Sequence, residues 1–161
     1  MGSKDPYTNN ATRMLDAKGI PYQAMEIPNR KMNAQEVADF LNAPPDQVYK
    51  TIVTKKEKNG KFVLALVPTP TQVNLKKLAK ALKEKKMVLP TQKEAEKATG
   101  LRAGGISPLI LVNKGFQTII DQQAEEMEEI IISAGQWGLQ IQMNPIDLAK
   151  LTNARFVPIA T

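Results

Sequence analysis

Residues 49–67 read YKTIVTKKEKNGKFVLALV and carry the strongest secondary-structure signal in the chain. Two runs rich in β-branched and apolar residues, 49–54 and 61–67, flank a Lys/Glu loop that ends in Asn59-Gly60. An Asn-Gly pair between two such runs is typical of a β-hairpin. The second run is apolar nearly throughout, as expected of a strand covered on both faces. The stretch therefore predicts a hairpin whose second strand lies in the centre of a sheet.

The segments before this hairpin combine helix and strand signals. Residues 10–18 predict a helix, and residues 22–27 predict a strand. Asn33, followed three residues later by Glu36, forms a capping-box pattern for a second helix. The pair Pro44-Pro45 ends that helix.

Helix caps and short apolar runs follow the hairpin. Asn74 caps the most regular helix, and Thr91 with Glu94 caps another that ends near Gly100. Asn144-Pro145 begins a final helix that extends to about residue 151. The expected strands are 87–89, 109–112, 118–121, 130–133 and 139–143, with an edge strand at 156–157. Because hairpins are mixed with helices rather than alternating regularly with them, we expect an α+β fold with a mixed sheet.

The composition is that of a folded chain that lacks two catalytic residue types. The chain has 161 residues, of which 42% are hydrophobic and 24% charged, and this balance predicts a single domain over residues 1–161. It contains neither cysteine nor histidine. Disulfides, thiolate nucleophiles, Ser-His-Asp arrangements and imidazole-bound metals are therefore excluded. We expect residues 1–8 to be a tail, disordered or derived from cloning, that takes no part in the fold.

Positive charge is concentrated in the middle of the chain. The net charge is +6, and residues 50–97 carry a net +9 while the remainder carries a net −3. This asymmetry favours a polyanionic partner such as nucleic acid, and a lysine-rich solvated surface explains it equally well. No run approaches the ~20 apolar residues of a membrane span, and no secretion signal opens the sequence. We therefore expect a cytoplasmic protein that has no membrane partner.

Three short segments carry groups suited to chemistry. In Tyr49-Lys50-Thr51, the lysine can bind phosphate or polarise an ester carbonyl, although a solvent-facing lysine is the commoner explanation. In Gly104-Gly105-Ile106-Ser107-Pro108, the glycines can present backbone N–H groups to a ligand or form only a tight turn. Residues 133–138, SAGQWG, can line a pocket at two strand ends or serve as a hairpin turn. The nearby carboxylates have the spacing of a solvated helical turn, so no metal is predicted at Asp121, Glu125, Glu126, Glu128 and Glu129.

The order of these segments along the chain is more specific for a protein family than any single segment is. The features that count are Val48-Tyr49-Lys50-Thr51, Thr99-Gly100, Gly104-Gly105-Ile106-Ser107-Pro108-Leu109, Thr118-Ile119-Ile120-Asp121, and Ser133-Ala134-Gly135 with Gly138. Together they resemble the YbaK/EbsC family of the prolyl-tRNA editing superfamily, over about residues 10–159. The resemblance implies a mixed, strongly curved β-sheet with flanking helices, in agreement with the α+β expectation.

The function that this resemblance implies is trans-editing of mischarged tRNA. Such enzymes deacylate aminoacyl-tRNA, most typically Cys-tRNA(Pro), because prolyl-tRNA synthetase does not fully exclude amino acids of similar size. The cysteinyl thiol of the substrate can attack its own ester carbonyl, which fits a chain without histidine and cysteine. The implied partners are aminoacyl-tRNA and prolyl-tRNA synthetase, with no cofactor and no metal.

The resemblance also assigns residue roles. Lys50 would contact the substrate or its terminal adenosine, and the loop with Gly104 and Gly105 would supply N–H groups near the scissile carbonyl. The substrate-binding residues would be Thr51, Ile106, Ser107, Pro108, Ser133, Gly138 and Gln140. Apart from the resemblance, the helix after Asn74 places four lysines on one side, which predicts contact with tRNA phosphates or a solvated face. These lysines are Lys76, Lys77, Lys80 and Lys83.

Two other functions stay open on the sequence alone. The chain could be a non-catalytic module of the same fold that binds tRNA or prolyl-tRNA synthetase, or it could deacylate tRNA charged with another amino acid, such as alanine. A general RNA-binding protein has less support. The chain has only four Phe, three Tyr and one Trp, and no aromatic pair suited to base stacking.

Overall fold

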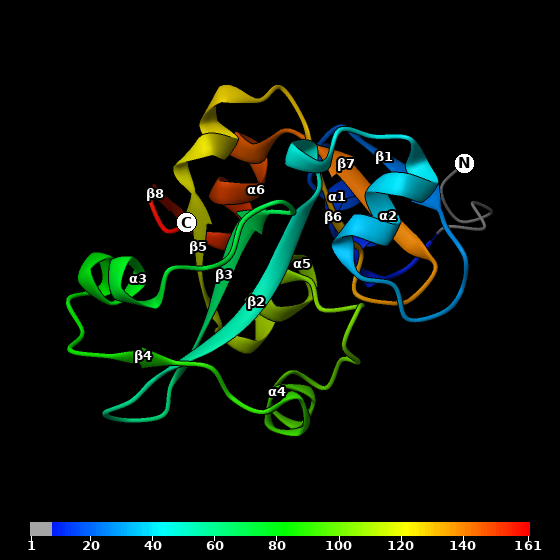
Figure 1. The fold of residues 1–161 in the computed structure, drawn as a ribbon. Coiled ribbons are helices and arrows are strands. Elements are labelled where there is room, and N and C mark those ends of the chain that lie inside the picture. The colour runs from blue at the N-terminus through cyan, green and yellow to red at the C-terminus, as the bar shows by residue number, and fades with distance from the viewer. Residues whose placement is uncertain (1–7) are drawn as a thin grey trace.

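The computed structural model describes residues 8–161, and in it helices and strands are interspersed along the chain (Figure 1). The α-helices are α1 (Asn10–Ala17), α2 (Ala34–Leu41), α3 (Leu75–Leu82), α4 (Gln92–Thr99), α5 (Pro108–Leu111) and α6 (Pro145–Thr152). The strands are β1 (Tyr22–Glu26), β2 (Tyr49–Lys56), β3 (Phe62–Pro68), β4 (Met87–Val88), β5 (Gln117–Asp121), β6 (Ile130–Ser133), β7 (Leu139–Met143) and β8 (Arg155–Val157). Three 3-10 turns are η2 (Pro45–Gln47), η3 (Val112–Lys114) and η4 (Gln122–Glu126). Of the expected tail, residues 1–7 lie outside the described residues.

The predicted central hairpin is confirmed. Strands β2 and β3 are antiparallel, with Tyr49 opposite Pro68 and Lys55 opposite Phe62. Strand β3 is buried on both faces because its side chains alternate between two apolar clusters. One cluster contains Leu64 and Leu66, and the other contains Val63, Ala65 and Val67.

The strands form two sheets, where the sequence analysis expected one curved sheet. Five strands have the order β4-β2-β3-β5-β8, and three have the order β1-β7-β6. The pairs β3–β5 and β5–β8 are parallel and the others are antiparallel, so the α+β class with mixed strands is confirmed. A single bridge between Val48 and Ile131 links the two sheets at the start of β2. Beyond this bridge, residues of both sheets line the same cavity.

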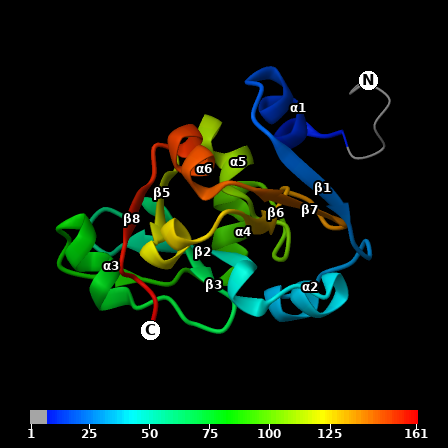
Figure 2. The same cartoon turned by 90° about the horizontal axis from the view of Figure 1, so that it is seen from above.

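Helices cover both faces of the five-stranded sheet. Figure 2 shows α1, α5 and α6 on one side, and α2 and α3 on the other. Helix α3 packs through Leu78 and Ala79 on the Val63–Val67 side, whereas α1, α5 and α6 contribute to the larger cluster on the opposite side. Among residues 8–161, no helix is both long enough and apolar enough to cross a bilayer.

The helix caps follow the local sequence. Asn33 with Glu36 and Thr91 with Glu94 form reciprocal capping boxes, as predicted. Asn74 accepts a hydrogen bond from the backbone of Lys77 at the start of α3. These predictions succeed because capping depends on residues within one helical turn.

Two expectations are wrong. Residues 109–112 belong to helix α5 and its continuation, not to a strand: the Ser107 hydroxyl accepts from the Leu109 N–H, and Pro108 occupies the first helical turn. Asp121 is not part of a solvated acidic turn. It is 2% exposed, and its carboxylate accepts from the backbone N–H groups of Ile159 and Ala160, so it fastens the end of the chain to β5.

Candidate functional site

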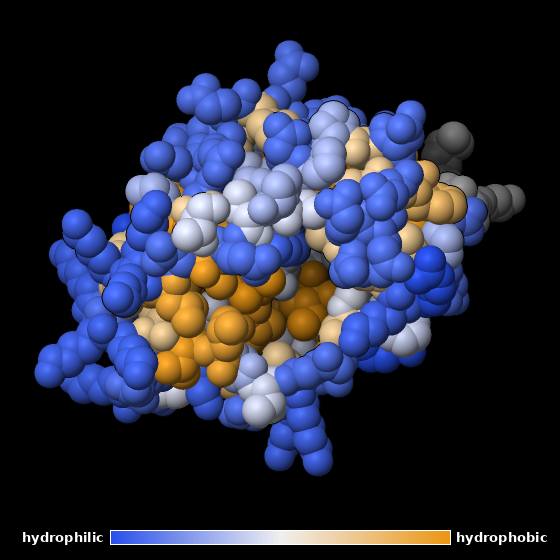
Figure 3. All heavy atoms as spheres, viewed as in Figure 1, coloured by the Kyte–Doolittle hydropathy of each residue, from blue (hydrophilic) through white to orange (hydrophobic). Residues whose placement is uncertain are grey.

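A cavity of about 310 Å³ opens beside the first half of β2. Figure 3 shows this face hollowed between β2 and α2, with apolar residues inside the hollow. The wall comes from four parts of the chain: α2 with the loop before it, strand β2 with Val48, the loop between α4 and α5, and the paired strands β6 and β7. The lining residues are Lys31, Met32, Asn33, Ala34, Val37, Val48, Tyr49, Lys50, Thr51, Ile52, Ala103, Gly104, Ile106, Ser133 and Gln140.

The cavity lies along an open edge of β2. Strand β4 pairs only with Lys55 and Lys56, and the bridge to β6 is at Val48, so residues 50–54 pair with no strand on that edge within residues 8–161. The Val48 carbonyl and the Lys56 N–H bond toward the β3 side, through Thr69 and Lys61 respectively. In an antiparallel pair the backbone groups alternate between the two edges, so those of Thr51 are directed to the open edge. The cavity is therefore bordered by backbone that a ligand can pair with.

Lys50 is half-buried at this edge and has no partner. Its ammonium group makes no hydrogen bond and no ion pair within residues 8–161. Burial lowers the pKa of its ammonium group. Because neighbouring residues of a strand point to opposite faces, Lys50 and Thr51 line the cavity from opposite faces of β2, which means that the cavity wraps around the strand edge.

Several neutral polar groups in the wall also lack partners. The hydroxyls of Tyr49 and Thr51 are buried without a hydrogen bond. Burial, reinforced by the negative charges of Asp121 and Asp46, raises the pKa of the Tyr49 phenol, so this group stays neutral. Gln140 is 4% exposed, and its side-chain amide bonds to nothing among residues 8–161. Buried polar groups are normally paired. A third buried hydroxyl without a partner, that of Thr118, lies on β5 outside the cavity wall, so within residues 8–161 such groups are not confined to the cavity.

Ser133 and Gln140 lie side by side because they are directly opposite each other in the β6–β7 pair. The Ser133 hydroxyl accepts a hydrogen bond of 3.1 Å from the Gly135 N–H, which shapes the turn between the strands. Both residues line the cavity, as do Lys50, Thr51, Gly104 and Ile106 among the residues singled out from the sequence.

The two glycines of the α4–α5 loop play different parts. Gly104 has φ +88°, and a side chain there would meet Lys31 and Met32 at 3.3 Å, so this glycine permits close packing of two cavity walls. Its N–H has no partner within residues 8–161, and the same is true of the Ile106 N–H. The Gly105 N–H already donates to the Arg102 carbonyl at 2.8 Å, which leaves Gly104 and Ile106 as the donors that line the cavity.

The other sequence-selected residues lie outside the cavity wall. Ser107 and Pro108 start α5 and are buried. Gly105 packs against the backbone of Gln136, and Gly138 against Asn29. The four lysines associated with α3 are all exposed, and none of them lines the cavity.

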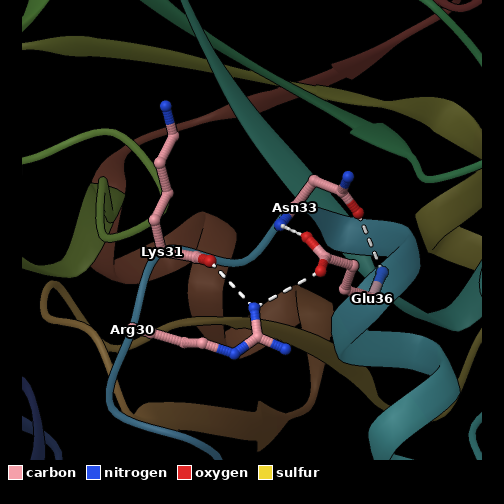
Figure 4. A network of polar contacts seen from close by, with 4 residues as sticks. All are labelled: Arg30, Lys31, Asn33 and Glu36. Atoms are coloured by element: carbon pink, nitrogen blue, oxygen red, sulfur yellow. Dashed lines mark hydrogen bonds and ion pairs between the residues drawn. The ribbon is translucent and has the colours of Figure 1, made fainter.

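Lys31 also lines the cavity, although its sequence pattern did not mark it as a site residue. Figure 4 shows how its loop is held: the Glu36 carboxylate accepts from the Asn33 N–H at 3.0 Å and pairs with the Arg30 guanidinium at 3.4 Å. These hydrogen bonds, the Asn33 bond first and then the Arg30 bond, lower the pKa of Glu36. Arg30 also donates to the Lys31 carbonyl at 3.2 Å, and Lys31 Nζ lies 3.4 Å from Gln92 Oε1. The only local signal was a basic pair before a helix cap.

This arrangement supplies positive charge and hydrogen-bond donors without carboxylates. Two lysines and the N–H groups of Gly104 and Ile106 border the cavity, and none of its described lining residues is Asp or Glu. Within residues 8–161, no group of three potential ligands is placed to hold a metal. Preorganised donors and cations of this kind stabilise negative charge that develops on a carbonyl oxygen.

Comparison with known proteins agrees with this chemistry. The family model of the aminoacyl-tRNA editing domain matches residues 29–151. A protein of Enterococcus faecalis, provisionally named Cys-tRNA(Pro)/Cys-tRNA(Cys) deacylase EbsC, is 36% identical over 98% of this chain and 96% of its own length. A proline–tRNA ligase of Staphylococcus aureus is 29% identical over 75% of this chain, which corresponds to 20% of the ligase.

Solved structures support the fold. The hypothetical protein APE2540 superimposes with a TM-score of 0.87 at 16% identity, covering 95% of this chain and all of that one. A structure provisionally described as a trans-editing enzyme for prolyl-tRNA synthetase gives a TM-score of 0.78 at 24% identity, covering 96% of this chain and 98% of that one. The resemblance inferred from the ordered segments is thus confirmed, and the chain belongs to the aminoacyl-tRNA editing domain family.

Proposed function

We propose that this chain is a trans-acting deacylase of mischarged aminoacyl-tRNA, with Cys-tRNA(Pro) as its preferred substrate. The observation that carries the proposal is one cavity lined by the unpartnered Lys50 and by Gly104 and Ile106, whose N–H groups are unpaired within residues 8–161. Such donors suit the oxyanion that forms when an ester carbonyl is attacked. Membership of the editing family makes an aminoacyl ester the relevant carbonyl. The name of the Enterococcus relative supports cysteine as the amino acid.

The nucleophile in this proposal comes from the substrate. The cysteinyl sulfur attacks the carbonyl carbon of its own ester, and the carbon–oxygen bond to the terminal ribose then breaks. The thiol proton ends on the ribose hydroxyl, and the products are free tRNA and a cyclic thiolactone. Lys50 and the Gly104 N–H stabilise the intermediate oxyanion and hold the ester in place. For an amino acid without a thiol, water takes the place of the sulfur and the product is the free amino acid.

The cavity volume supports a small aminoacyl group. About 310 Å³ lies at the lower end of ligand pockets, which run from roughly 300 to 1,000 Å³. Apolar side chains such as Met32 and Val37 would contact the amino-acid side chain, while Thr51, Ser133 and Gln140 offer polar groups to its amine or thiol.

The exposed lysines suit the rest of the tRNA. Lys76, Lys77, Lys80 and Lys83 make no ion pair within the described chain, and Figure 1 places α3 across the hairpin from α2. We assign this face to salt-dependent contact with acceptor-stem phosphates. The similarity to part of a proline–tRNA ligase supports tRNA(Pro) and prolyl-tRNA synthetase as partners. We propose a cytoplasmic location because translation takes place there.

A deacylation panel tests this function. The protein is incubated with Cys-, Ala- and Pro-charged tRNA(Pro) and with Cys-charged tRNA(Cys), and loss of the amino acid is followed. We expect loss from Cys-tRNA(Pro) to be fastest and Pro-tRNA(Pro) to be spared. Faster loss of alanine would assign the other amino acid, and no loss from any species would favour a non-catalytic binding module.

A substrate without a free thiol tests the mechanism separately. S-methylcysteinyl-tRNA(Pro) has nearly the same size, but it cannot form the thiolactone. Substrate-assisted cleavage predicts that its deacylation falls to the slow rate of water attack. An unchanged rate would replace the thiol with water as the nucleophile and leave the deacylase function standing.

A further inference from the structure

The wall of the cavity that carries Gly104 lies between α4 and α5, in a segment without regular secondary structure. Both peptide groups of Ala103 in this segment are nevertheless fixed by side chains. Its N–H donates to Glu96 Oε2 at 2.7 Å, and its carbonyl accepts from Trp137 Nε1 at 2.9 Å. The wall is therefore held from α4 on one side and from the β6–β7 turn on the other.

Arg102 strengthens the connection to the turn. Its guanidinium carbon lies 3.6 Å from the centre of the Trp137 ring, a close cation–π contact, and it makes no ion pair within residues 8–161. The Arg102 carbonyl accepts from the Gly105 N–H, and Gly105 in turn packs against the Gln136 backbone, which a side chain would approach to 3.2 Å. Tryptophan and arginine thus join two loops that are more than thirty residues apart.

This connection determines the direction of one hydrogen-bond donor. The peptide between Ala103 and Gly104 is trans, so its carbonyl and its N–H point in opposite directions. Because Trp137 holds the carbonyl, the Gly104 N–H is directed away from Trp137 and has no partner within the described chain. Gly104 itself lines the cavity.

We infer that Trp137, supported by Arg102, is a positioning residue that orients the Gly104 N–H toward the ester carbonyl of the substrate. This inference rests on the proposed deacylase function and adds to it the cause of the donor's orientation. Trp137 acts through the Ala103–Gly104 peptide and does not itself line the cavity.

The test compares Trp137→Phe with wild type and with Gln136→Ala. The phenyl ring keeps an aromatic face for Arg102 but has no N–H for the Ala103 carbonyl. Gln136→Ala is the matched control, because its side chain lies on the same turn and its only hydrogen bond within residues 8–161 is the one it accepts from Asn9. We expect Trp137→Phe to lower kcat about 10-fold per folded molecule, with KM within about 2-fold, as for loss of a transition-state contact. Gln136→Ala should retain the wild-type kcat, and Arg102→Lys should fall between the two.

A purely structural role for Trp137 would reduce the folded fraction and leave kcat per folded molecule unchanged. That result, with folded protein quantified by circular dichroism, would overturn the inference. A kcat that falls equally in Gln136→Ala would also overturn it, because the effect would then belong to the turn as a whole.

A second measurement does not depend on turnover. A non-hydrolysable cysteinyl-adenosine amide is titrated into ¹⁵N-labelled protein, and the Gly104 amide resonance is followed. We expect a shift in wild type that is lost in Trp137→Phe. If the wild-type protein binds the amide but deacylates no tRNA, the proposed function fails, and the Gly104 resonance still tests the positioning role of Trp137. If the Gly104 resonance shifts equally in both proteins, the positioning inference fails and the proposed function is unaffected. The indole fluorescence of Trp137, the sole tryptophan of the chain, reports binding in the wild-type protein.

Discussion

The two ends of strand β2 carry lysines in opposite electrostatic surroundings. At the end remote from the cavity, Lys55 Nζ lies 2.8 Å from Glu94 Oε2 and Lys56 Nζ lies 3.5 Å from Glu84 Oε2. At the cavity end, Lys50 has no such partner among residues 8–161, and burial lowers its pKa. The fold therefore pairs the lysines at the remote end with carboxylates and leaves Lys50 unpaired beside the cavity.

The threonines of the strand show the same contrast. Thr54 is buried and donates to the Val63 carbonyl at 2.8 Å, whereas the buried hydroxyl of Thr51 has no partner. An unpaired buried polar group costs stability, so its retention beside a cavity indicates a function in binding. Residue type alone does not distinguish the two ends, since each has Lys and Thr. The partners supplied by the fold distinguish them.

The largest difference is expected when one lysine is removed from each end of β2. We expect Lys50→Ala to lower kcat/KM for Cys-tRNA(Pro) about 100-fold or more, because it removes a charge next to the developing oxyanion. Lys55→Ala should leave activity within about 2-fold and cost at most about 1 kcal/mol, as for a surface ion pair. Steady-state deacylation and urea unfolding measure both quantities. Equal effects of the two substitutions on activity would remove Lys50 from the site.

Gly104→Ala, with Gly19→Ala as its control, extends the comparison to the opposite wall of the cavity. Both glycines have positive φ, +88° and +66°, so each alanine costs roughly 1–2 kcal/mol of backbone strain. Only at Gly104 does the new methyl meet neighbours, Lys31 and Met32. We expect Gly104→Ala to lose about 10-fold or more in kcat/KM, since it displaces the cavity wall, while Gly19→Ala loses stability alone. If the two variants had matching activities, Gly104 would serve only the turn.

Substitution of Thr51 and of Thr54 should have different effects on stability. Thr51→Val removes an unpaired hydroxyl, so we expect stability to stay the same or rise by up to ~1 kcal/mol. Thr54→Val removes a hydrogen bond and should cost about 1 kcal/mol. Activity should move the opposite way, with a loss of roughly 5-fold in kcat/KM for Thr51→Val, a typical size for one neutral hydrogen bond, and little for Thr54→Val. A stability loss in Thr51→Val would show that its hydroxyl does find a partner in solution.

The pH dependence tests whether the charge on Lys50 matters. Because burial lowers the pKa of Lys50, its ammonium loses its proton at a lower pH than that of an exposed lysine. Enzymatic rate, corrected for spontaneous ester hydrolysis, should be retained below this pKa and decline as pH rises through it. Lys50→Arg keeps its charge at high pH, so its decline should begin at higher pH. An identical alkaline decline in both proteins would assign it to another group.

The smallest effect is expected at α3, far from the contrast within β2. Replacing Lys76, Lys77, Lys80 and Lys83 with Gln should raise KM for aminoacyl-tRNA by a few-fold and flatten its dependence on salt, with kcat nearly constant. Hydrolysis of a minimal aminoacyl-adenosine should not respond, which separates tRNA contact from chemistry. If the salt dependence on full tRNA persists, the tRNA docks elsewhere and α3 is a solvated face.

Elements whose deciding interactions lie close together in the sequence were predicted correctly. The β2–β3 hairpin and the caps at Asn33, Asn74 and Thr91 were predicted because their signals lie within a few residues. Residues 109–112 were assigned to a strand because an apolar run of four fits either structure. The Leu109 N–H at the start of the run donates to the Ser107 hydroxyl, which lies two residues before it and caps the helix.

The sequence indicated individual candidate residues of the site but not which of them lie together at the cavity. Lys50, Thr51, Gly104, Ser133 and Gln140 were all selected from the sequence, and all line one cavity. The sequence did not separate them from Ser107, Pro108 and Gly138, whose roles are local packing and capping. Residues of one sequence motif are adjacent along the chain, but their side chains point in different directions. Only some of them therefore line the cavity between the two sheets.

The amino-acid sequence alone predicted the hairpin and the helix caps, showed that histidine and cysteine are absent, and singled out Lys50 as a candidate site residue. The tertiary structure alone decided which groups lack partners, because pairing depends on residues brought together from distant segments. Lys31 reaches the cavity mouth from the loop before α2, and Trp137 fixes Ala103 across two loops. Ile110 fills the space that a side chain at Gly135 would need, so the loop and the turn fit each other only in the folded chain.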